Sequence, residues 1–325
     1  MSDWEGVRLH VVTGKGGTGK TTVAASLAIA LAAGGRTTLL VEVEERQGLA
    51  QLFDVPPLPY AEQKLAVAPA GGDIYGLAVD AHQAMYEYLE MYYRLGRAGR
   101  ALERFGVIDF ATTIAPGLRD VLLTGKTYEA TRRRHAGRHT YDAVVLDAPP
   151  TGRIARFLNV TAAVRSIARV GPVERHARST MELIRSPQTA VHIVTVLEEM
   201  PVQETVDAIG ELHEVGIPVG GVIVNQVREP HLSTRQLAAA RARRLDPSAV
   251  QSGLEAAGIT PTDTIVDQLL DEAAEHADRV RLEQQQRKTV AAADRPTYEL
   301  PHLADGIDLA ALYEFAGALS DQGAA

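Results

Sequence analysis

The sequence predicts an α/β protein in which a doubly wound, mostly parallel sheet carries a helical insertion. A β-rich run, a glycine-rich turn and a helix-forming run follow one another near the start of the chain. Apolar, β-branched runs then alternate with runs at helical spacing, and neither an internal repeat nor a flexible linker interrupts the 325 residues. We therefore expect residues 1–325 to form a single domain rather than two smaller ones.

The first predicted unit is a strand, a helix and a second strand. Residues Arg8–Thr13 are mostly apolar or β-branched, and Thr21–Ala33 is rich in Ala and Leu at helical spacing. Gly34 and Gly35 follow, as expected at the C-terminal end of a helix. Because Thr37–Val43 is a second apolar, β-branched run, this unit requires parallel pairing of its two strands.

The remaining elements are predicted from the same alternation. Further strands are expected at Ile74–Val79, Tyr141–Leu146, Ala190–Val196 and Gly220–Asn225. Further helices are expected at Ala81–Leu95, Arg97–Phe105, Pro201–Glu214, Leu232–Arg244, Asp267–Val290 and Leu309–Leu319. Several of these helices fall between two consecutive strands, so residues 81–138 are the predicted helical insertion.

Composition excludes several classes of protein. Hydrophobic residues make up 46% and charged residues 23%, as in ordinary globular proteins. The net charge of −8 argues against a nucleic-acid partner. The absence of cysteine excludes disulfides, cysteine-ligated zinc and iron–sulfur clusters, and fits a cytoplasmic location. Since no run of about 18 apolar residues occurs, we expect no integral membrane segment.

A glycine-rich loop carries the strongest functional signal. Gly14–Thr21 fits the pattern G-x-x-x-x-G-K-[ST], and its position between a predicted strand and a predicted helix disfavours a chance glycine-rich turn. Such a loop turns its amides around a triphosphate, while Lys20 neutralises phosphate charge and Thr21 offers a hydroxyl to Mg²⁺. The predicted ATP-binding residues are Gly14, Lys15, Gly16, Gly17, Thr18, Gly19, Lys20, Thr21 and Thr22.

Two strand-end residues extend this prediction. Asp147 ends an apolar strand, where its carboxylate can hold Mg²⁺ through water, although a strand-end aspartate can also cap a helix. Asn225 also ends a strand, and its amide can donate to and accept from the N6/N7 edge of adenine. The alternative for Asn225 is hydrogen bonding within a local turn.

The chain resembles the ArsA family of ATPases, which includes the arsenical pump ATPase and the ATPase that targets tail-anchored membrane proteins. It is similar to an actinobacterial branch without cysteines, whose members look like single-domain proteins that pair up. Besides the loop, the similar segments are Tyr141–Arg153 (a strand and the second switch), Val196–Thr205, the adenine-recognition Val224–Gln226, and the nucleotide-side Leu300–Pro301.

The resemblance implies a P-loop NTPase of the deviant Walker A class, which hydrolyses ATP as a homodimer or as a heterodimer with an ArsA-like paralogue. Its Mg-ATP state would then govern binding and release of an unidentified protein client. By resemblance, Lys15 is the signature lysine that reaches the nucleotide of the facing subunit, as an arginine finger does. Offsetting local negative charge is the alternative role for Lys15. Pro301 is a nucleotide-binding residue by the same resemblance.

Glu44 is the clearest departure from the family pattern. The first switch of the family reads Asp-Pro-Ala-His, whereas this chain has Glu44-Glu45-Arg46-Gln47. Glu44 thus takes the place of the aspartate that positions the attacking water, and a shift of about 1 Å can cost roughly 100-fold in rate. The chain would then hydrolyse ATP slowly or with a partner, or else be a weak subunit that stabilises an active paralogue. A solvated acidic turn is the other reading, and Glu42 is a less favoured substitute.

Three further sets of residues have more than one possible role. Arg153 takes the place of a family histidine and would either respond to the γ-phosphate or pair with acids such as Glu45. Basic runs at Arg132–Arg134 and Arg241–Arg244 are expected to be solvated helix faces or interface partners. The aromatic run Met85–Tyr93 is expected to pack in the core or at a dimer interface rather than to bind a client.

Overall fold

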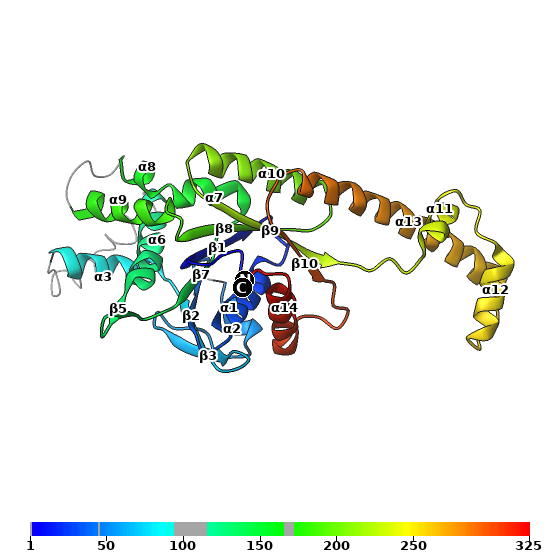
Figure 1. Cartoon of the computed structure of the whole chain (residues 1–325), viewed down its shortest axis with the longest axis horizontal. Helices are drawn as coiled ribbons and strands as arrows, with labels where there is room; N and C mark the ends of the chain where they lie inside the picture. Colours follow the sequence, from blue (N-terminus) through cyan, green and yellow to red (C-terminus); the bar gives the residue numbers. More distant parts are fainter. Residues whose placement is uncertain (1, 45, 94–115, 166–171) are drawn as a thin grey trace.

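The computed structural model describes residues 2–44, 46–93, 116–165 and 172–325. In this part of the chain, one sheet has the order β10-β9-β8-β1-β7-β2-β4-β3, and every neighbouring pair is parallel except the antiparallel β3 and β4 (Figure 1). The strands are β1 (Leu9–Gly14), β2 (Thr37–Glu42), β3 (Gln63–Val67), β4 (Asp73–Ala78), β7 (Ala143–Asp147), β8 (Thr189–Thr195), β9 (Val219–Val227) and β10 (Thr297–Pro301).

Helices cover both faces of this sheet. They are α1 (Lys20–Ala32), α2 (Gly48–Leu52), α3 (Ala81–Tyr93), α6 (Pro116–Arg132), α7 (Thr151–Leu158), α8 (Val160–Arg165), α9 (Pro172–Ile184), α10 (Glu199–Glu214), α11 (Thr234–Arg241), α12 (Pro247–Ala256), α13 (Asp263–Ala291) and α14 (Leu309–Asp321). The sequence-based prediction of a doubly wound α/β fold is therefore confirmed.

Each central strand contributes to two separate apolar cores. In β2, Leu39 and Val41 pack with α7 and α10 on one face, whereas Leu40 packs with α1 and α14 on the other. Alternate side chains of a strand point to opposite faces, so a strand between two helical layers must be apolar throughout. This requirement explains why the central strands appear in the sequence as continuous apolar runs.

The edge elements were harder to predict than the centre. The sequence analysis did not predict β3, β10 or the helices α7, α8 and α9, which lie between β7 and β8. In the short edge strand β10 only Tyr298 and Leu300 are buried, so its apolar signal is weak. The helix expected at Arg97–Phe105 lies outside the described residues.

The helical insertion draws on two separate parts of the chain. Between β4 and β7 lie α3, α6 and a short hairpin of β5 (Arg134–His135) and β6 (Arg138–His139). Helices α8 and α9 follow β7 and pack against α6. The insertion predicted at residues 81–138 is thus completed by helices that the chain adds after the next strand.

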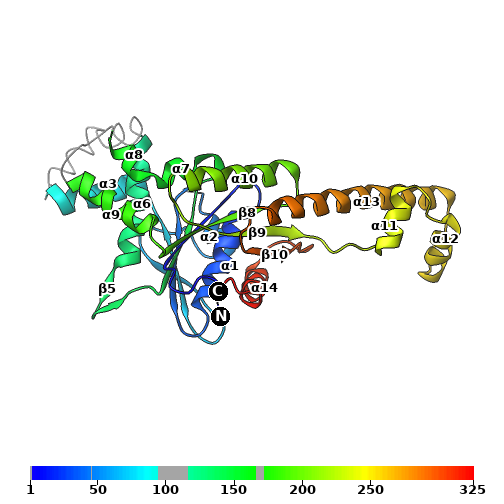
Figure 2. The same ribbon diagram turned by 45° about the horizontal axis from the view of Figure 1, so that its top comes forward.

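A helical arm projects from the opposite side of the molecule. Helix α13 has 29 residues, which corresponds to a length of about 43 Å. Figures 1 and 2 show it leading away from the sheet, with α11 and α12 at its far end. Helix α12 contains no buried residue, and the other end of α13 packs on α10. None of the described helices has the length and apolar character needed to cross a membrane.

Candidate functional site

The loop between β1 and α1 has a shape that glycine residues require. A Cβ atom on Gly14 would lie 2.2 Å from the carbonyl oxygen of Val194, and one on Gly19 would lie 2.3 Å from Nδ2 of Asn225. Gly19 also has a φ of 87°, in the left-handed region. On the outer side of the loop, Gly16 and Gly17 face open space. The loop can therefore wrap around a ligand without being blocked by side chains of its own.

The start of α1 presents its amides to this loop. No side chain caps the first turn of the helix, so its free N–H groups and its dipole favour an anion. Lys20 is buried at this end of the helix, and the hydroxyl of Thr18 donates to the carbonyl oxygen of Lys15 at 2.8 Å. Thr22 is half-buried in the same turn.

Asp147 lies directly beside Thr21. The Thr21 hydroxyl donates to Oδ2 of Asp147 at 2.7 Å, which joins the start of α1 to the end of β7. Oδ1 of Asp147 is buried and has no hydrogen-bond partner among the described residues. Burial raises the pKa of Asp147 to about 7, with Glu42 and Glu44 adding to the rise, although the Thr21 hydrogen bond and Lys20 act against it. An unsatisfied carboxylate oxygen beside a threonine hydroxyl fits hydrated Mg²⁺, which prefers oxygen ligands.

Glu42 has a more central position than the sequence indicated. Its register on β2 places it opposite Asp147 on β7. Its carboxylate is buried and accepts hydrogen bonds from the amides of Gly48 at 3.0 Å and Leu49 at 3.5 Å, at the start of α2. Glu44 is half-buried and has no hydrogen bond or ion pair with a described residue. Glu42 thus fixes the segment that joins β2 to α2, while Glu44 remains available for another contact.

Lys15 contacts a side chain of its own subunit. Its Nζ lies 2.5 Å from Oε1 of Glu204 on α10, and Oε2 of Glu204 accepts a hydrogen bond from the Thr151 hydroxyl at 3.0 Å. The hydrogen bond from Lys15 lowers the pKa of Glu204. Lys15 is 32% exposed, so it remains accessible from outside the subunit. The sequence analysis did not identify Glu204 as its partner, because α10 lies far from the loop in sequence.

Asn225 packs against the loop. Its Nδ2 donates to the carbonyl oxygen of Thr18 at 2.9 Å, and its Oδ1 accepts from the amide of Gln226 at 2.9 Å. One N–H and one lone pair of the amide are left over for a base. Pro301 ends the neighbouring strand β10, where it pairs with Val227, so both residues lie at the same edge of the sheet.

Arg153 forms an ion pair in the structure, but with a different acid from the one considered from the sequence. Its guanidinium lies 3.8 Å from the buried Asp120 on α6, and its side chain is 63% exposed. Burial raises the pKa of Asp120 despite the nearby arginines Arg153, Arg156 and Arg119. The previously considered partner, Glu45, lies outside the described residues.

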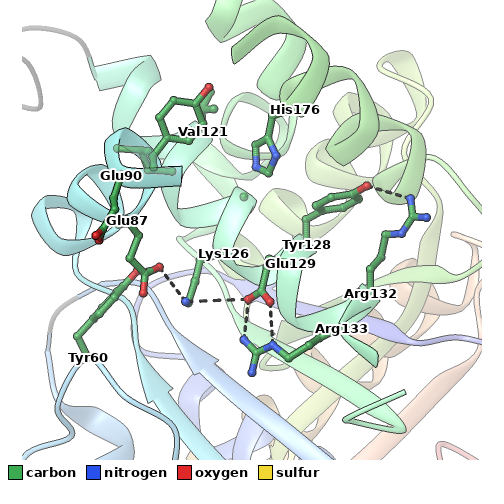
Figure 3. A pocket seen from close by; sticks show the side chains of 14 residues that line it. Tyr60, Glu87, Glu90, Val121, Lys126, Tyr128, Glu129, Arg132, Arg133 and His176 are labelled. Atoms are coloured by element: carbon green, nitrogen blue, oxygen red, sulfur yellow. Dashed lines mark hydrogen bonds and ion pairs between the residues drawn. The ribbon is translucent and has the colours of Figure 1, made fainter. Parts of the chain in front are cut away.

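A separate cavity of about 750 Å³ lies between α3 and α6 (Figure 3). Lys126 forms an ion pair with Glu87 at 2.8 Å and lies over the ring of Tyr60, 5.4 Å from its centroid. Within the aromatic run of α3, Met85 is buried in the core, as expected, whereas Tyr88 lines the cavity. The side chains of Met91, Tyr92 and Tyr93 lie outside the described residues.

Comparisons with known proteins identify relatives of this chain. A family model described as anion-transporting ATPase, the ArsA ATPase model, matches residues 7–184 and 172–244. The chain is 53% identical over 319 residues to the ATPase BagA of Mycobacterium tuberculosis, covering 98% of this chain and 94% of that protein. An ATPase of Mycobacterium bovis matches to the same extent. The arsenical pump-driving ATPase of Escherichia coli is 26% identical over 219 residues, covering 67% of this chain and 34% of that protein.

Proposed function

The chain belongs to the ArsA family of ATPases, and from this premise we propose that it binds Mg-ATP at the loop between β1 and α1 and hydrolyses it as a dimeric conformational switch. The proposal depends most on the Thr21–Asp147 hydrogen bond beneath the open glycine loop, with Oδ1 of Asp147 unsatisfied. We further propose that residues 1–325 act as one P-loop ATPase domain in the cytoplasm, without a nucleic-acid partner.

The proposed roles follow from the contacts of each group. The amides of Gly16 to Lys20 and the ammonium group of Lys20 hold the β- and γ-phosphates. The Thr21 hydroxyl binds Mg²⁺ directly, and Asp147 binds it through water. When bound, Mg²⁺ neutralises charge that develops on the phosphates. Asn225 and Pro301 contact the adenine, and Asn225 also fixes the loop through its hydrogen bond to Thr18.

Lys15 is proposed to act on the nucleotide of the facing subunit. A cation that reaches the γ-phosphate only in the dimer stabilises transition-state charge in the manner of an arginine finger. Its ion pair with Glu204 is accessible to solvent and therefore weak enough to be exchanged for such a contact. The same exchange would release Glu204 from Thr151, which lies in the second switch segment.

A second candidate function is a weak nucleotide-binding subunit that stabilises an active paralogue in a heterodimer. The feature that favours it is Glu44, because its carboxylate lies one methylene further from the backbone than the family's aspartate. In this alternative, Glu42 keeps the first switch in place through α2 without positioning a water molecule.

Contacts between helices provide a route from the nucleotide site to a client. We propose that closure of the dimer moves α7 and α10, which meet at the Glu204–Thr151 hydrogen bond, and that this motion reaches the insertion. The cavity in Figure 3 lies in this insertion and is lined in part by α6, a helix that also contacts α7. A client that binds there would be gripped or released according to the nucleotide state.

ATP hydrolysis by the purified chain, alone and with any co-purifying paralogue, tests these functions. We expect magnesium-dependent turnover by the chain alone, loss of nucleotide binding in Lys20→Ala, and a fall of about 1,000-fold or more in turnover in Lys15→Ala. Turnover only in the mixture would instead support the silent-subunit function. If Lys15→Ala retains full activity, the proposed action across the dimer is wrong. An intact chain without affinity for Mg-ATP or Mg-ADP would refute both functions.

A further inference from the structure

A second cavity, of about 530 Å³, lies at the N-terminal ends of the strands β1 and β8. We call it the Arg8 cavity. Its walls come from the residue before β1, the end of α6, the β5–β6 hairpin, α9 and the turn into β8. The lining residues are Arg8, Thr131, Arg132, Arg134, His139, Ser179, Glu182, Leu183, Ser186 and Gln188. The phosphate loop is at the other end of β1, about 20 Å away along six residues of strand.

The guanidinium group of Arg8 is held in place, but one of its N–H groups has no hydrogen-bond acceptor among the described residues. Its Nη2 donates to the carbonyl oxygens of Thr131 at 3.2 Å and Tyr141 at 2.7 Å, which fixes the guanidinium group. Its Nε is buried and has no hydrogen-bond partner among the described residues. A buried N–H without an acceptor is costly, so a fixed donor of this kind indicates a missing acceptor.

His139, another residue that lines the cavity, has a second buried donor without an acceptor. Nη2 of Arg134 lies 3.2 Å from its Nε2. Because a guanidinium group can only donate, Nε2 must accept, and the proton of the neutral ring resides on Nδ1. Nδ1 is buried and, within the described part of the chain, has no hydrogen-bond partner. Two residues that line one cavity and come from distant parts of the sequence therefore each have an N–H group without an acceptor.

The charge of the lining is positive. Arg8, Arg132 and Arg134 have no carboxylate within 4 Å among the described residues, and Arg132 instead donates to the hydroxyl of Tyr128. The neighbouring Arg133 differs, because Glu62 and Glu129 both pair with it. Glu182 is the acidic residue among the described lining residues, and it is exposed and forms no ion pair with these arginines. Burial lowers the pKa of His139, and the charges of Arg8 and Arg134 lower it further.

We propose that the Arg8 cavity binds a phosphate group, held by the guanidinium groups of Arg8, Arg132 and Arg134 with the ring of His139 beside it. A phosphate supplies several acceptor oxygens and the negative charge that the arginines lack. The volume exceeds that of a bare oxyanion and lies in the range of small-ligand sites, so a small phosphorylated metabolite fits it. The site is independent of the proposed ATPase activity.

Calorimetric titration of the Mg-ADP-saturated protein tests this site with the phosphate loop already filled. The two probes are inorganic phosphate and glycerol 3-phosphate. The probe with the higher affinity shows whether the site prefers free phosphate or a phosphate monoester. We expect Arg134→Gln to weaken binding by about 10- to 100-fold, since one charged hydrogen bond is lost. Arg8→Gln should act similarly, but it also removes two carbonyl contacts. The exposed Arg134 therefore carries the test if Arg8→Gln unfolds.

The matched control is Arg138→Gln, which removes the same charge from the same hairpin but does not line the cavity. Binding to this variant should change by less than about twofold at physiological salt. In NMR spectra, phosphate should shift the ring nitrogens of His139 more than those of the exposed His135. The proposal is wrong if neither probe binds, if Arg138→Gln and Arg134→Gln lose binding equally, or if the His139 signals do not move.

Discussion

Asp147 combines a structural cost with its proposed role in binding Mg²⁺. It is buried at the end of β7, near Glu42 and Glu44, and one of its oxygens lacks a partner among the described residues. A buried carboxylate in such surroundings destabilises the ligand-free protein, and a bound cation offsets that cost. Strained or poorly satisfied groups of this kind are typical of functional sites, where stability is exchanged for activity.

Replacement of Asp147 should separate stability from activity. We expect Asp147→Asn to stabilise the ligand-free protein by about 1 kcal/mol, because the amide carries no charge to bury, and to lower magnesium-dependent ATP turnover by about 100-fold. Denaturant unfolding without nucleotide and steady-state hydrolysis measure the two effects. Asp142→Asn, at the exposed start of the same strand, is the control for turnover. Unchanged turnover in Asp147→Asn would rule out a role in holding Mg²⁺.

Two buried histidines, His10 and His192, are expected to lower the stability of the fold at acidic pH. Nδ1 of His10 lies 3.1 Å from Nε2 of His192 on the neighbouring strand, and their rings are stacked. Nδ1 of His192 accepts from the amide of Gly221 at 3.3 Å. Burial lowers the pKa of both rings, that of His192 to about 4, and the charge of His192 lowers the pKa of His10 further. Trp4 meets His192 edge to face at 5.1 Å between centroids.

This pair should make folding stability depend on pH. The unfolded histidines bind protons near pH 6.5, whereas the folded ones do so only at lower pH, so stability is complete above pH 7 and falls as the pH drops from 6.5 toward 4. We expect His192 alone to cause a loss on the order of 3 kcal/mol across this range, and His10 to add to it. Urea unfolding followed by the fluorescence of Trp4, the single tryptophan of the chain, measures it. The double variant His10→Phe/His192→Asn should show a smaller loss, and an equal loss would assign the effect to other groups.

The end of α6 shows how packing assigns different roles to adjacent residues of one type. Arg133, the residue after α6, pairs with Glu129 of that helix and with Glu62 before β3, and Glu62 accepts a further hydrogen bond from Tyr141 at 2.6 Å. This network ties the insertion to the edge of the sheet. Arg134, the next residue, is exposed and contacts only His139 among the described residues. Arg132–Arg134 is expected from the sequence to be a solvated helix face or an interface partner, and the paired Arg133 does not fit the first of these roles.

These two arginines should differ in their effect on stability. We expect Arg133→Met to destabilise the protein by about 1–2 kcal/mol. A fully buried network would contribute more, but Arg133, Glu129 and Glu62 are all partly exposed. Arg134→Met should change stability by less than about 0.5 kcal/mol. Chemical denaturation of both variants provides the comparison. Similar small effects for the two would mean that the Glu62 and Glu129 contacts add nothing measurable.

Across the molecule, the contacts of the switch segments connect the phosphate loop to distant helices. Lys15 and Thr151 share Glu204 on α10, and Glu42 holds α2. The base of the arm, α13, packs on the same α10. A change in the position of Lys15 therefore acts on an element that packs against both α7 and the arm.

Release of Lys15 from Glu204 should promote activity in the dimer. In Glu204→Gln the lysine no longer gives up an ion pair to reach the facing subunit, so we expect ATP turnover at low protein concentration to rise about two- to fivefold, the range of an exposed ion pair. Specific activity should also increase with protein concentration. Glu211→Gln removes an exposed charge from the same helix and should leave turnover unchanged. A fall in turnover in Glu204→Gln would show that Glu204 supports the reaction rather than restraining it.

The sequence by itself determined the glycine-rich loop, the central strands and the α/β architecture of a sheet between two helical layers. These features depend on neighbours along the chain: the spacing of Gly14, Gly19, Lys20 and Thr21, and apolar runs long enough to be buried on both faces. Strand-end Asp147 could be proposed as a magnesium-binding residue for the same reason, since parallel strands bring their carboxyl ends to one edge.

Only the tertiary structure decided which distant side chains meet. Strand order places Glu42 opposite Asp147, the return of the chain through α10 brings Glu204 to Lys15, and β9 brings Asn225 to Thr18. The Arg8 cavity likewise joins residues that lie more than 120 positions apart. No local pattern encodes such contacts, because they depend on the register and crossing of elements that the whole apolar core fixes at once.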